Sequence, residues 1–394
     1  MKSVLLWKRT IEYYMMLAFC KWKSDLDTIF DDILKLYRDK YITPSDTKLL
    51  NLFFKKDVTQ DDLDNFLEVW DIEKEGGHKA LMLSYFMKLH PEFTYSSYIE
   101  PRLNGILKYY RFKNLSLVSH YKKICTAIKQ AGIEFLVLKG GALKYYNPEF
   151  PRIMGDIDIL VPPKDYEKAK KIALSFGYKY TEHEHSIDLQ DPQTDLTLLD
   201  IHYKFNMHTA TDDSITEDIF KRAKRENVFG IDGVYVPCVE DMLFLLLVNL
   251  NKNMAQYSSF PSILYSIIDS KYLINLKPDF DWDIVKQNAV KTQTEHHLAV
   301  AIRFINEYAS DKLPEMYEKE FNERCILHIY NEWYLKKLQK KSHTLFIDTV
   351  KRIIKNIIKY FKFRYLYIIH RQKSVRTDVN RAKSILETQD LIKR

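Results

Sequence analysis

Two carboxylates lie one residue apart inside an apolar segment of the sequence. Asp156 and Asp158 flank Ile157 in the stretch GDIDILV. Side chains alternate along a β-strand, so a strand here would place both carboxylates on one face. Burying two like charges together is costly unless positive charge lies between them. Oxygen ligands at this spacing suit Mg²⁺ or Mn²⁺, while a carboxylate pair on a solvent-facing edge strand is the alternative interpretation.

A third acid follows in a second apolar segment, TLLDIHYKF. Asp200 and His202 would share one face of a strand there, opposite Leu199 and Ile201. Metal-assisted phosphoryl transfer uses carboxylates to hold two cations and to lower the pKa of an attacking hydroxyl. Three acids on adjacent strands are the arrangement that this chemistry requires. A single charge at a strand end is the alternative interpretation of Asp200.

A glycine pair precedes the acids and points to the same chemistry. Gly140 and Gly141 directly follow the apolar segment FLVLK, whose last residue is Lys139. Glycines between a strand and a helix let backbone amides approach a phosphate at the helix N-terminus, and a lysine can reach the same phosphate. A tight turn with a surface lysine is the other interpretation.

These residues need a sheet with helices packed on it to hold them in place. Between Ser116 and Tyr203 the sequence predicts the order helix, strand, turn, helix, strand, helix, strand, strand, with helices closed by Gly132 and Gly177. That order is typical of an α/β unit of about 100 residues. Helical periodicity dominates before and after it, and Gly76-Gly77 is expected to end a helix that begins after Thr59-Gln60.

The glycine pair, the alternating Asp156 and Asp158 and the later Asp200 together resemble the signature of the DNA polymerase beta-like nucleotidyltransferase superfamily. More closely, LKGGALKYYNPEFPRIMGDIDILVPPKDYEKAKKIALSFGY followed by LLDIHYKF is similar to a bacterial family described as uncharacterised nucleotidyltransferases. The resemblance covers about Leu115 to Ala309.

The resemblance implies a role for each matching residue. Asp156 and Asp158 would hold two Mg²⁺ (or Mn²⁺) ions, and Asp200 would hold the catalytic ion and help to deprotonate the acceptor hydroxyl. The residues implied to contact the triphosphate are Lys139, Gly140, Gly141 and Arg152. His202 matches an Asp-Leu-His element of the family. Asp269, in SIIDSK, is a further candidate that would help to close the site from the helical region, with a surface acid as the alternative.

The expected fold is α+β, with a nucleotidyltransferase-type mixed β-sheet core flanked by helices and helical regions at both ends. We expect a helical N-terminal region at 1–114, a nucleotidyltransferase core at 115–237, a helical domain at 238–334 and a basic amphipathic helical tail at 335–394. The expected reaction moves a nucleoside monophosphate from an NTP such as ATP to an acceptor hydroxyl or phosphate and releases pyrophosphate. A tRNA- or RNA-modifying transferase or toxin, and an inactive nucleotide-binding partner protein, are the alternatives.

Charge is unevenly distributed along the chain. The net charge is +7, but residues 335–394 alone carry 17 Lys and Arg against 4 Asp and Glu. Three interpretations of this tail stay open: packing on the protein, lying on an anionic membrane surface, or binding RNA. The acceptor is accordingly a small molecule, a saccharide, a protein or RNA. The four cysteines are widely spaced, and no apolar segment is long enough to span a membrane. These features predict a cytoplasmic protein, with peripheral membrane attachment as the alternative.

Other motifs carry less weight. His183 and His185 flank Glu184 and would face the same way in a strand, but no further ligand is evident, so a solvated strand end or loop is the preferred interpretation. The sequence contains neither the glycine-rich P-loop motif nor the nucleophile motif of serine hydrolases, which leaves those two classes without support.

Overall fold

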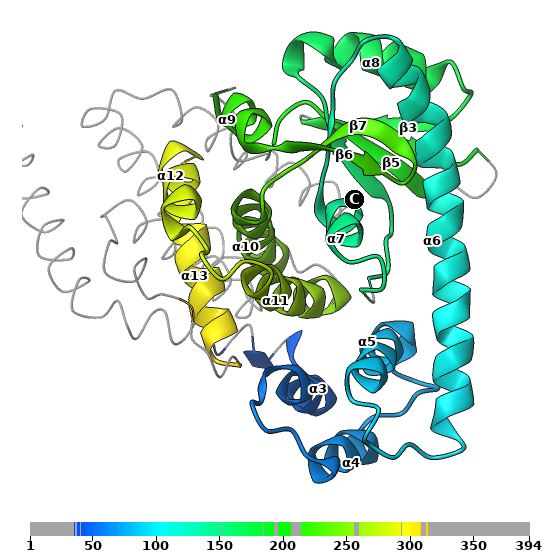
Figure 1. Cartoon of the computed structure of the whole chain (residues 1–394), viewed down its shortest axis with the longest axis vertical. Helices are drawn as coiled ribbons and strands as arrows, with labels where there is room; N and C mark the ends of the chain where they lie inside the picture. The colour runs from blue at the N-terminus through cyan, green and yellow to red at the C-terminus, as the bar shows by residue number, and fades with distance from the viewer. Residues whose placement is uncertain are drawn as a thin grey trace, which may run out of the picture.

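The computed structural model describes residues 35, 38–39, 41–150, 152–183, 185–192, 196–205, 214–255, 260–292, 294–308 and 313. The basic tail expected at 335–394 and nearly all of residues 1–40 lie outside these residues. Figure 1 shows three groups of elements: a sheet with its helices at the top, a helical group in the middle and the N-terminal helices below.

The sheet confirms the expected mixed α+β fold. Seven strands lie in the order β3-β4-β5-β2-β1-β7-β6, with β2 parallel to β5, β1 parallel to β7 and the other neighbours antiparallel. The strands span Leu136–Val137 (β1), Ile157–Leu160 (β2), Lys179–Glu182 (β3), Ser186–Gln190 (β4), Thr197–His202 (β5), Lys224–Val228 (β6) and Ile231–Val236 (β7). The hairpin of β6 and β7 adds a sheet edge that the sequence analysis did not predict.

The central strands are short and fully buried. All four residues of β2 are buried, and β1 has only two residues, both buried. Pro162 follows β2 closely and cannot donate a backbone hydrogen bond to a neighbouring strand, which is consistent with the end of β2. Short buried strands hold their end residues rigidly because packed side chains fix the backbone on both faces.

A single long helix connects the sheet to the N-terminal helices. Helix α6 spans Ile99–Gln130 and lies against β2, β5 and β7. It runs along one edge of the molecule from the N-terminal helices to the sheet (Figure 1). The boundary expected at residue 114 therefore falls inside a continuous helix. The predicted C-terminal signal is confirmed, because Gly132 follows the helix end with φ +76°, a conformation that glycine adopts without strain.

Three helices precede α6: α3 (Pro44–Phe54), α4 (Gln60–Val69) and α5 (Gly76–Leu89). Thr43 and Thr59 each begin a helix with a capping box, in which Asp46 and Asp62 return the hydrogen bond. The expectation that Gly76-Gly77 ends a helix is wrong, since the pair begins α5. Helix α4 already ends at Val69, and a Cβ on Gly77 would lie 2.3 Å from the Tyr110 ring, so the glycine makes room for that ring.

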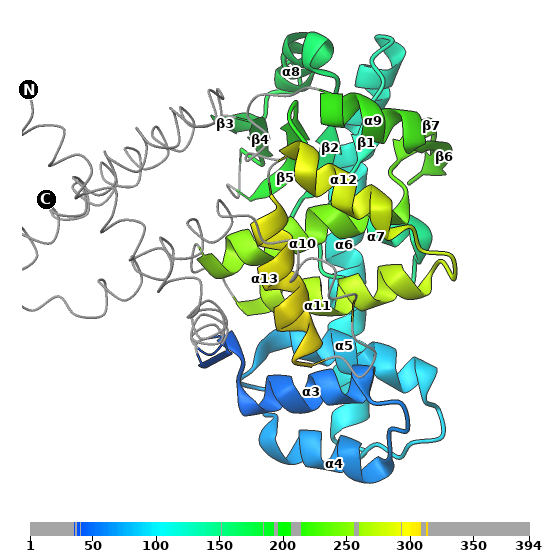
Figure 2. The ribbon, with the colours of Figure 1, turned by 90° about the vertical axis from the view of Figure 1, so that its left-hand side faces the viewer.

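The helical group after the sheet packs around α10. Helix α10 contacts α11, α12 and α13, and it also reaches α7 beside the sheet. Figure 2 shows α10 and α11 between the sheet and the N-terminal helices. The helices are α7 (Lys139–Tyr146), α8 (Tyr166–Leu174), α9 (Ser214–Arg222), α10 (Val239–Ala255), α11 (Phe260–Asn275), α12 (Trp282–Thr292) and α13 (Glu295–Asn306). Among the described helices, none is long and apolar enough to cross a bilayer.

Candidate functional site

Strand pairing brings two of the predicted acids side by side. In the parallel pair of β2 and β5, Asp158 lies directly opposite Asp200, and both side chains are buried. Leu199 and Ile201 are fully buried on the other face, as the alternation in TLLDIH predicts. The apolar residues thus anchor β5 in the core, and the polar residues of the same strand meet Asp158.

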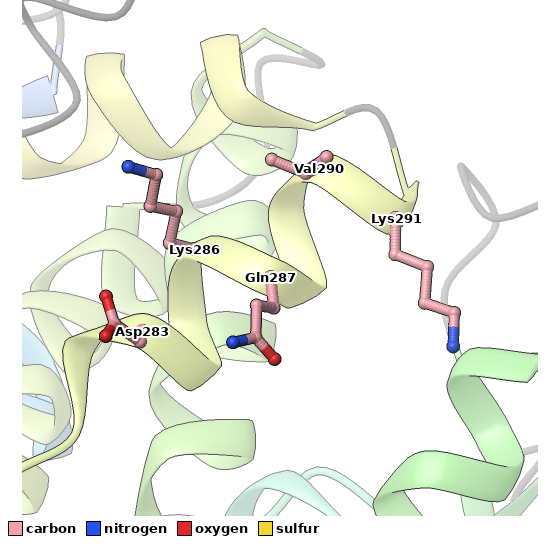
Figure 3. A pocket seen from close by; sticks show the side chains of 5 residues that line it. All are labelled: Asp283, Lys286, Gln287, Val290 and Lys291. Atoms are coloured by element: carbon pink, nitrogen blue, oxygen red, sulfur yellow. The ribbon is translucent and has the colours of Figure 1, made fainter.

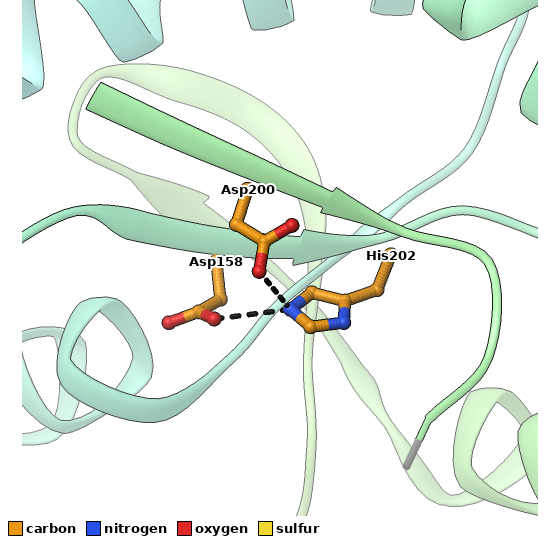
Figure 4. A group of neighbouring side chains, drawn as sticks. All are labelled: Asp158, Asp200 and His202. Carbon is orange, nitrogen blue, oxygen red and sulfur yellow. Dashed lines mark hydrogen bonds and ion pairs between the residues drawn. The ribbon is translucent and has the colours of Figure 1, made fainter. Parts of the chain in front are cut away.

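His202 lies between these two carboxylates. Its Nε2 is 3.0 Å from Asp158 Oδ1 and 2.9 Å from Asp200 Oδ2 (Figure 4). Burial by itself would lower the pKa of His202, but the carboxylates of Asp200 and Asp158 raise it above its ordinary value. Burial would likewise raise the pKa of Asp200, yet the neighbouring imidazole lowers it. The imidazole between the two acids therefore offsets part of their repulsion.

Lys139 supplies a positive charge to the same acids. Its Nζ forms an ion pair with Asp158, and its backbone has a φ of +46°, which is uncommon for a residue with a side chain. Burial would raise the pKa of Asp158, but Lys139 and His202 hold it below its ordinary range. Asp156, directly before β2, has a pKa raised to about 7 by burial and by the charge of Asp158. The Lys139 ammonium and the His202 imidazole thus lie among the acids and counter their charge.

The glycine pair lies in the first turn of α7, next to these acids. A Cβ on Gly141 would lie 2.7 Å from Val137 Cγ2, so α7 packs against β1 too closely for a side chain. The amides at this end of the helix have no partner within the helix and carry the positive end of its dipole. Leu138 N–H donates to Asp158 O at 2.9 Å, which ties the start of α7 to β2.

Arg152 and Asp269 meet on the other side of the glycine pair. A Cβ on Gly140 would lie 3.7 Å from Arg152 Nε, so the guanidinium stem lies beside the turn. Arg152 Nη1 is 3.1 Å from Asp269 Oδ2 on α11, and Asp269 is fully buried. Asn114 Nδ2 on α6 donates to Arg152 O at 2.9 Å. Helix α11 thus contributes Asp269 through Arg152 and not as a surface acid.

One further acid of the same row was not predicted from the sequence. Asp188 on β4 lies opposite Asp200 in the antiparallel pair of β4 and β5, so three carboxylates lie in line across β2, β5 and β4. Burial and the charge of Asp200 raise the pKa of Asp188. The alternation in SIDLQ gives the face of Asp188, but nothing in the sequence states that β4 pairs with β5.

The histidines set aside in the sequence analysis lie beside this row. His183 is in the turn between β3 and β4, where its Nε2 is 3.0 Å from Asp188 Oδ2. The His185 ring lies 5.4 Å from the ring of His202. His183 is exposed, as expected of a solvated turn, but the turn carries it to an acid of the site.

The described residues contain one group whose ligand atoms converge as a metal site requires. Asp158, Asp200 and His202 each offer an atom, all within 4.8 Å of one another. A separate hollow lies along α12 and contains none of the predicted site residues (Figure 3). It is lined by Asp283, Lys286, Gln287, Val290 and Lys291. The acid row and the glycine turn, and not this hollow, form the candidate site.

A mixed sheet with paired acids on neighbouring strands and a glycine turn beside them defines a nucleotidyltransferase-type protein. Residues 81–310 match the family described as "Uncharacterised nucleotidyltransferase", which is more than half of the chain. The protein belongs to this family of nucleotidyltransferases. The matched region begins in α5 and therefore includes part of the N-terminal helical region.

Similarities to individual proteins are weaker. The antibiotic-resistance factor ANT(2'')-Ia, solved in solution, is 14% identical with a TM-score of 0.35, covering 46% of this chain and 94% of that one. A nucleotidyltransferase-like protein from Paracoccidioides brasiliensis is 15% identical with a TM-score of 0.32, covering 48% of this chain and 92% of that one. No curated protein matches the sequence.

Proposed function

We propose that this protein transfers a nucleoside monophosphate from an NTP to a hydroxyl or phosphate of an acceptor and releases pyrophosphate, with Mg²⁺ or Mn²⁺ bound by its carboxylates. The observation that carries the proposal is the buried alignment of Asp158 and Asp200 on parallel strands. The adjoining turn at Gly140 and Gly141 suits a triphosphate, because helix-end amides bind anions.

The residues present fit a divalent cation. Asp200 Oδ1 is buried and accepts no hydrogen bond within the described part of the chain. Carboxylate oxygens are the ligands that Mg²⁺ and Mn²⁺ prefer, and an imidazole suits Mn²⁺ as well. Asp156, Asp158 and Asp200 would hold the ions. Bound cations would neutralise charge on the phosphates and lower the pKa of an attacking hydroxyl.

The protein's own residues would bind and orient the nucleotide. Amides of Gly140 and Gly141 donate to the triphosphate, and Lys139 and Arg152 balance its negative charge. Asp200 accepts the proton of the acceptor hydroxyl, and His202 fixes the orientation of Asp200 by the hydrogen bond between them. The low exposure of the row strengthens each of these electrostatic contacts because water is largely excluded.

Within this proposal the catalytic core is residues 115–237. The family is a bacterial one and a member of the DNA polymerase beta-like superfamily. ATP is the first nucleotide to test. A small molecule, a saccharide, a protein and RNA are the acceptor classes that labelling can separate.

The decisive experiment incubates the full-length protein with each α-labelled NTP, Mg²⁺ and a cell extract, and identifies the labelled component. We expect EDTA to abolish labelling. We also expect labelling to fall at least about 100-fold in Asp158→Asn and in Asp200→Asn, because these residues would bind the ions directly, and the loss of a residue that only supports a metal ligand already lowers activity about 10- to 100-fold. Asp283→Asn, an exposed acid on α12, is the matched control. Labelling that persists in both Asp→Asn variants would contradict the proposal, and nucleotide binding without labelling would favour an inactive binding protein.

A further inference from the structure

Arg152 lies where three parts of the chain meet. Its side chain is only 16% exposed, and it runs beside Gly140 in the turn before α7. Its guanidinium carbon lies 4.4 Å from the centre of the Tyr265 ring on α11. A guanidinium on an aromatic face is held in orientation by both cation–π attraction and stacking. The Tyr265 ring, together with the ion pair to Asp269 on the same helix, therefore sets the direction of Arg152.

Tyr265 is in turn held by the N-terminal helices. His78 Nδ1 on α5 is 3.1 Å from the Tyr265 hydroxyl, and the two rings meet edge-on at 5.3 Å. Burial, with the nearby charge of Arg152, lowers the pKa of His78 to about 4, so the ring is neutral at pH 7. In the tautomer that carries its proton on Nε2, a neutral His78 accepts at Nδ1 a hydrogen bond that the Tyr265 hydroxyl donates.

The position of His78 is itself determined by packing. Its ring lies 6.4 Å from the ring of Tyr110 on α6, and Tyr110 occupies the space that a side chain on Gly77 would fill. Tyr265 is 3% exposed, so it has little room to move away from His78. The contacts thus run without a gap from α5 through Tyr265 to Arg152 and the glycine turn.

We propose that His78 and Tyr265 are positioning residues for nucleotide binding, which fix the Arg152 guanidinium beside Gly140 and so make the N-terminal helices part of the site. This inference rests on the proposed function in one respect, that the anion bound at the turn is an NTP. His78 and Tyr265 would act on the turn through another residue. Their effect passes through Arg152, whose Nη1 forms an ion pair with Asp269 and whose Nε, beside Gly140, donates no hydrogen bond within the described residues, so that Nε is the donor left for an anion.

The test compares two substitutions that keep the rings and remove the hydrogen bond. Nucleotide affinity of the full chain is measured by calorimetry with ATP, GTP, CTP and UTP in Mg²⁺, for wild type, His78→Phe and Tyr265→Phe. We expect the Kd of the best-bound NTP to rise about tenfold in each variant. His78→Asn, whose carboxamide oxygen can accept the same hydrogen bond, should keep most of the wild-type nucleotide affinity.

The chain offers a matched control pair. His120 Nδ1 on α6 lies 2.8 Å from the Tyr178 hydroxyl, with the rings edge-on at 5.8 Å, and this pair is not among the contacts that lead from α5 to Arg152. Tyr178→Phe should therefore leave nucleotide affinity unchanged. In an Arg152→Gln background, Tyr265→Phe should have no additional effect. The inference is overturned if Tyr265→Phe lowers nucleotide affinity by the same factor in the Arg152→Gln background as in wild type. It is also overturned if His78→Phe and Tyr265→Phe both bind nucleotide with wild-type affinity.

A measurement without nucleotide separates this inference from the proposed function. The Arg152 Nε–H resonance, observed by ¹⁵N NMR, should show a ring-current shift in wild type that is reduced in His78→Phe and unchanged in Tyr178→Phe. If wild type binds none of the four nucleotides, the proposed function fails, and this resonance alone still decides whether His78 positions Arg152. An identical Arg152 resonance in wild type and His78→Phe refutes the positioning role.

Discussion

Replacing Asp269 by asparagine should make the protein more stable at neutral pH. Asp269 is fully buried, and neither of its carboxylate oxygens accepts a hydrogen bond from a residue that the structure describes. Burial raises its pKa to about 6, although Arg152 at 3.1 Å acts in the opposite direction. The ionised side chain is therefore destabilising in the folded protein, and a neutral amide of the same shape removes that penalty.

The magnitude follows from the difference between the folded and unfolded pKa values. A value of about 6 against the ordinary 3.8 corresponds to about 3 kcal/mol at pH 7. A raised pKa favours the folded state below pH 4, and this contribution is lost as the pH rises through 6. Asp269→Asn should thus match wild type near pH 4 and exceed it by up to about 3 kcal/mol at pH 7.

Urea unfolding of both proteins at pH 4.5 and pH 7 measures this difference in the free energy of unfolding. Asp241 provides the contrast, because it is equally buried but accepts hydrogen bonds from Arg222 Nη2 at 2.7 Å and from Asn288 Nδ2 at 2.7 Å. Asp241→Asn should destabilise by about 3 kcal/mol or more, since it breaks a paired buried charge. The reasoning fails if Asp269→Asn is less stable than wild type at pH 7, because the contact with Arg152 would then outweigh the burial of the charge.

Two further predictions concern the glycine turn and the acid row. Gly141→Ala should lower the free energy of unfolding by about 1–3 kcal/mol, because its Cβ would lie 2.7 Å from Val137 Cγ2. Gly140→Ala, with its nearest contact at 3.4 Å, should change stability little yet weaken NTP binding, and equal destabilisation in both variants would contradict this. Asp188→Asn should reduce Mn²⁺ affinity about tenfold in a direct titration, because Asp188 lies opposite Asp200 in the row. Unchanged Mn²⁺ affinity would remove Asp188 from the site.

The sequence alone was enough to predict the chemistry of single strands. In IDIL and TLLDIH, apolar residues flank Asp158 and Asp200 on both sides, so alternation places each acid on the opposite face from its neighbours without any knowledge of the fold. The glycine pair after an apolar strand likewise predicts the turn at the start of α7. These features are local, because alternation and backbone freedom depend on neighbouring residues only.

Contacts between residues that are far apart in the sequence could be predicted only in part. Asp188 had no visible role until the pairing of β4 with β5 placed it opposite Asp200. His78, which no sequence pattern singled out, meets Tyr265 only because α5 and α11 approach each other there.

The physical reason is the range of the interactions. Strand order and helix packing depend on how apolar faces bury one another across the whole chain, and no local pattern encodes which face meets which. The sequence therefore determined which residues could hold cations and phosphates. The tertiary structure alone decided that His202 lies between two acids, that Arg152 lies on Tyr265, and that the N-terminal helices reach the site.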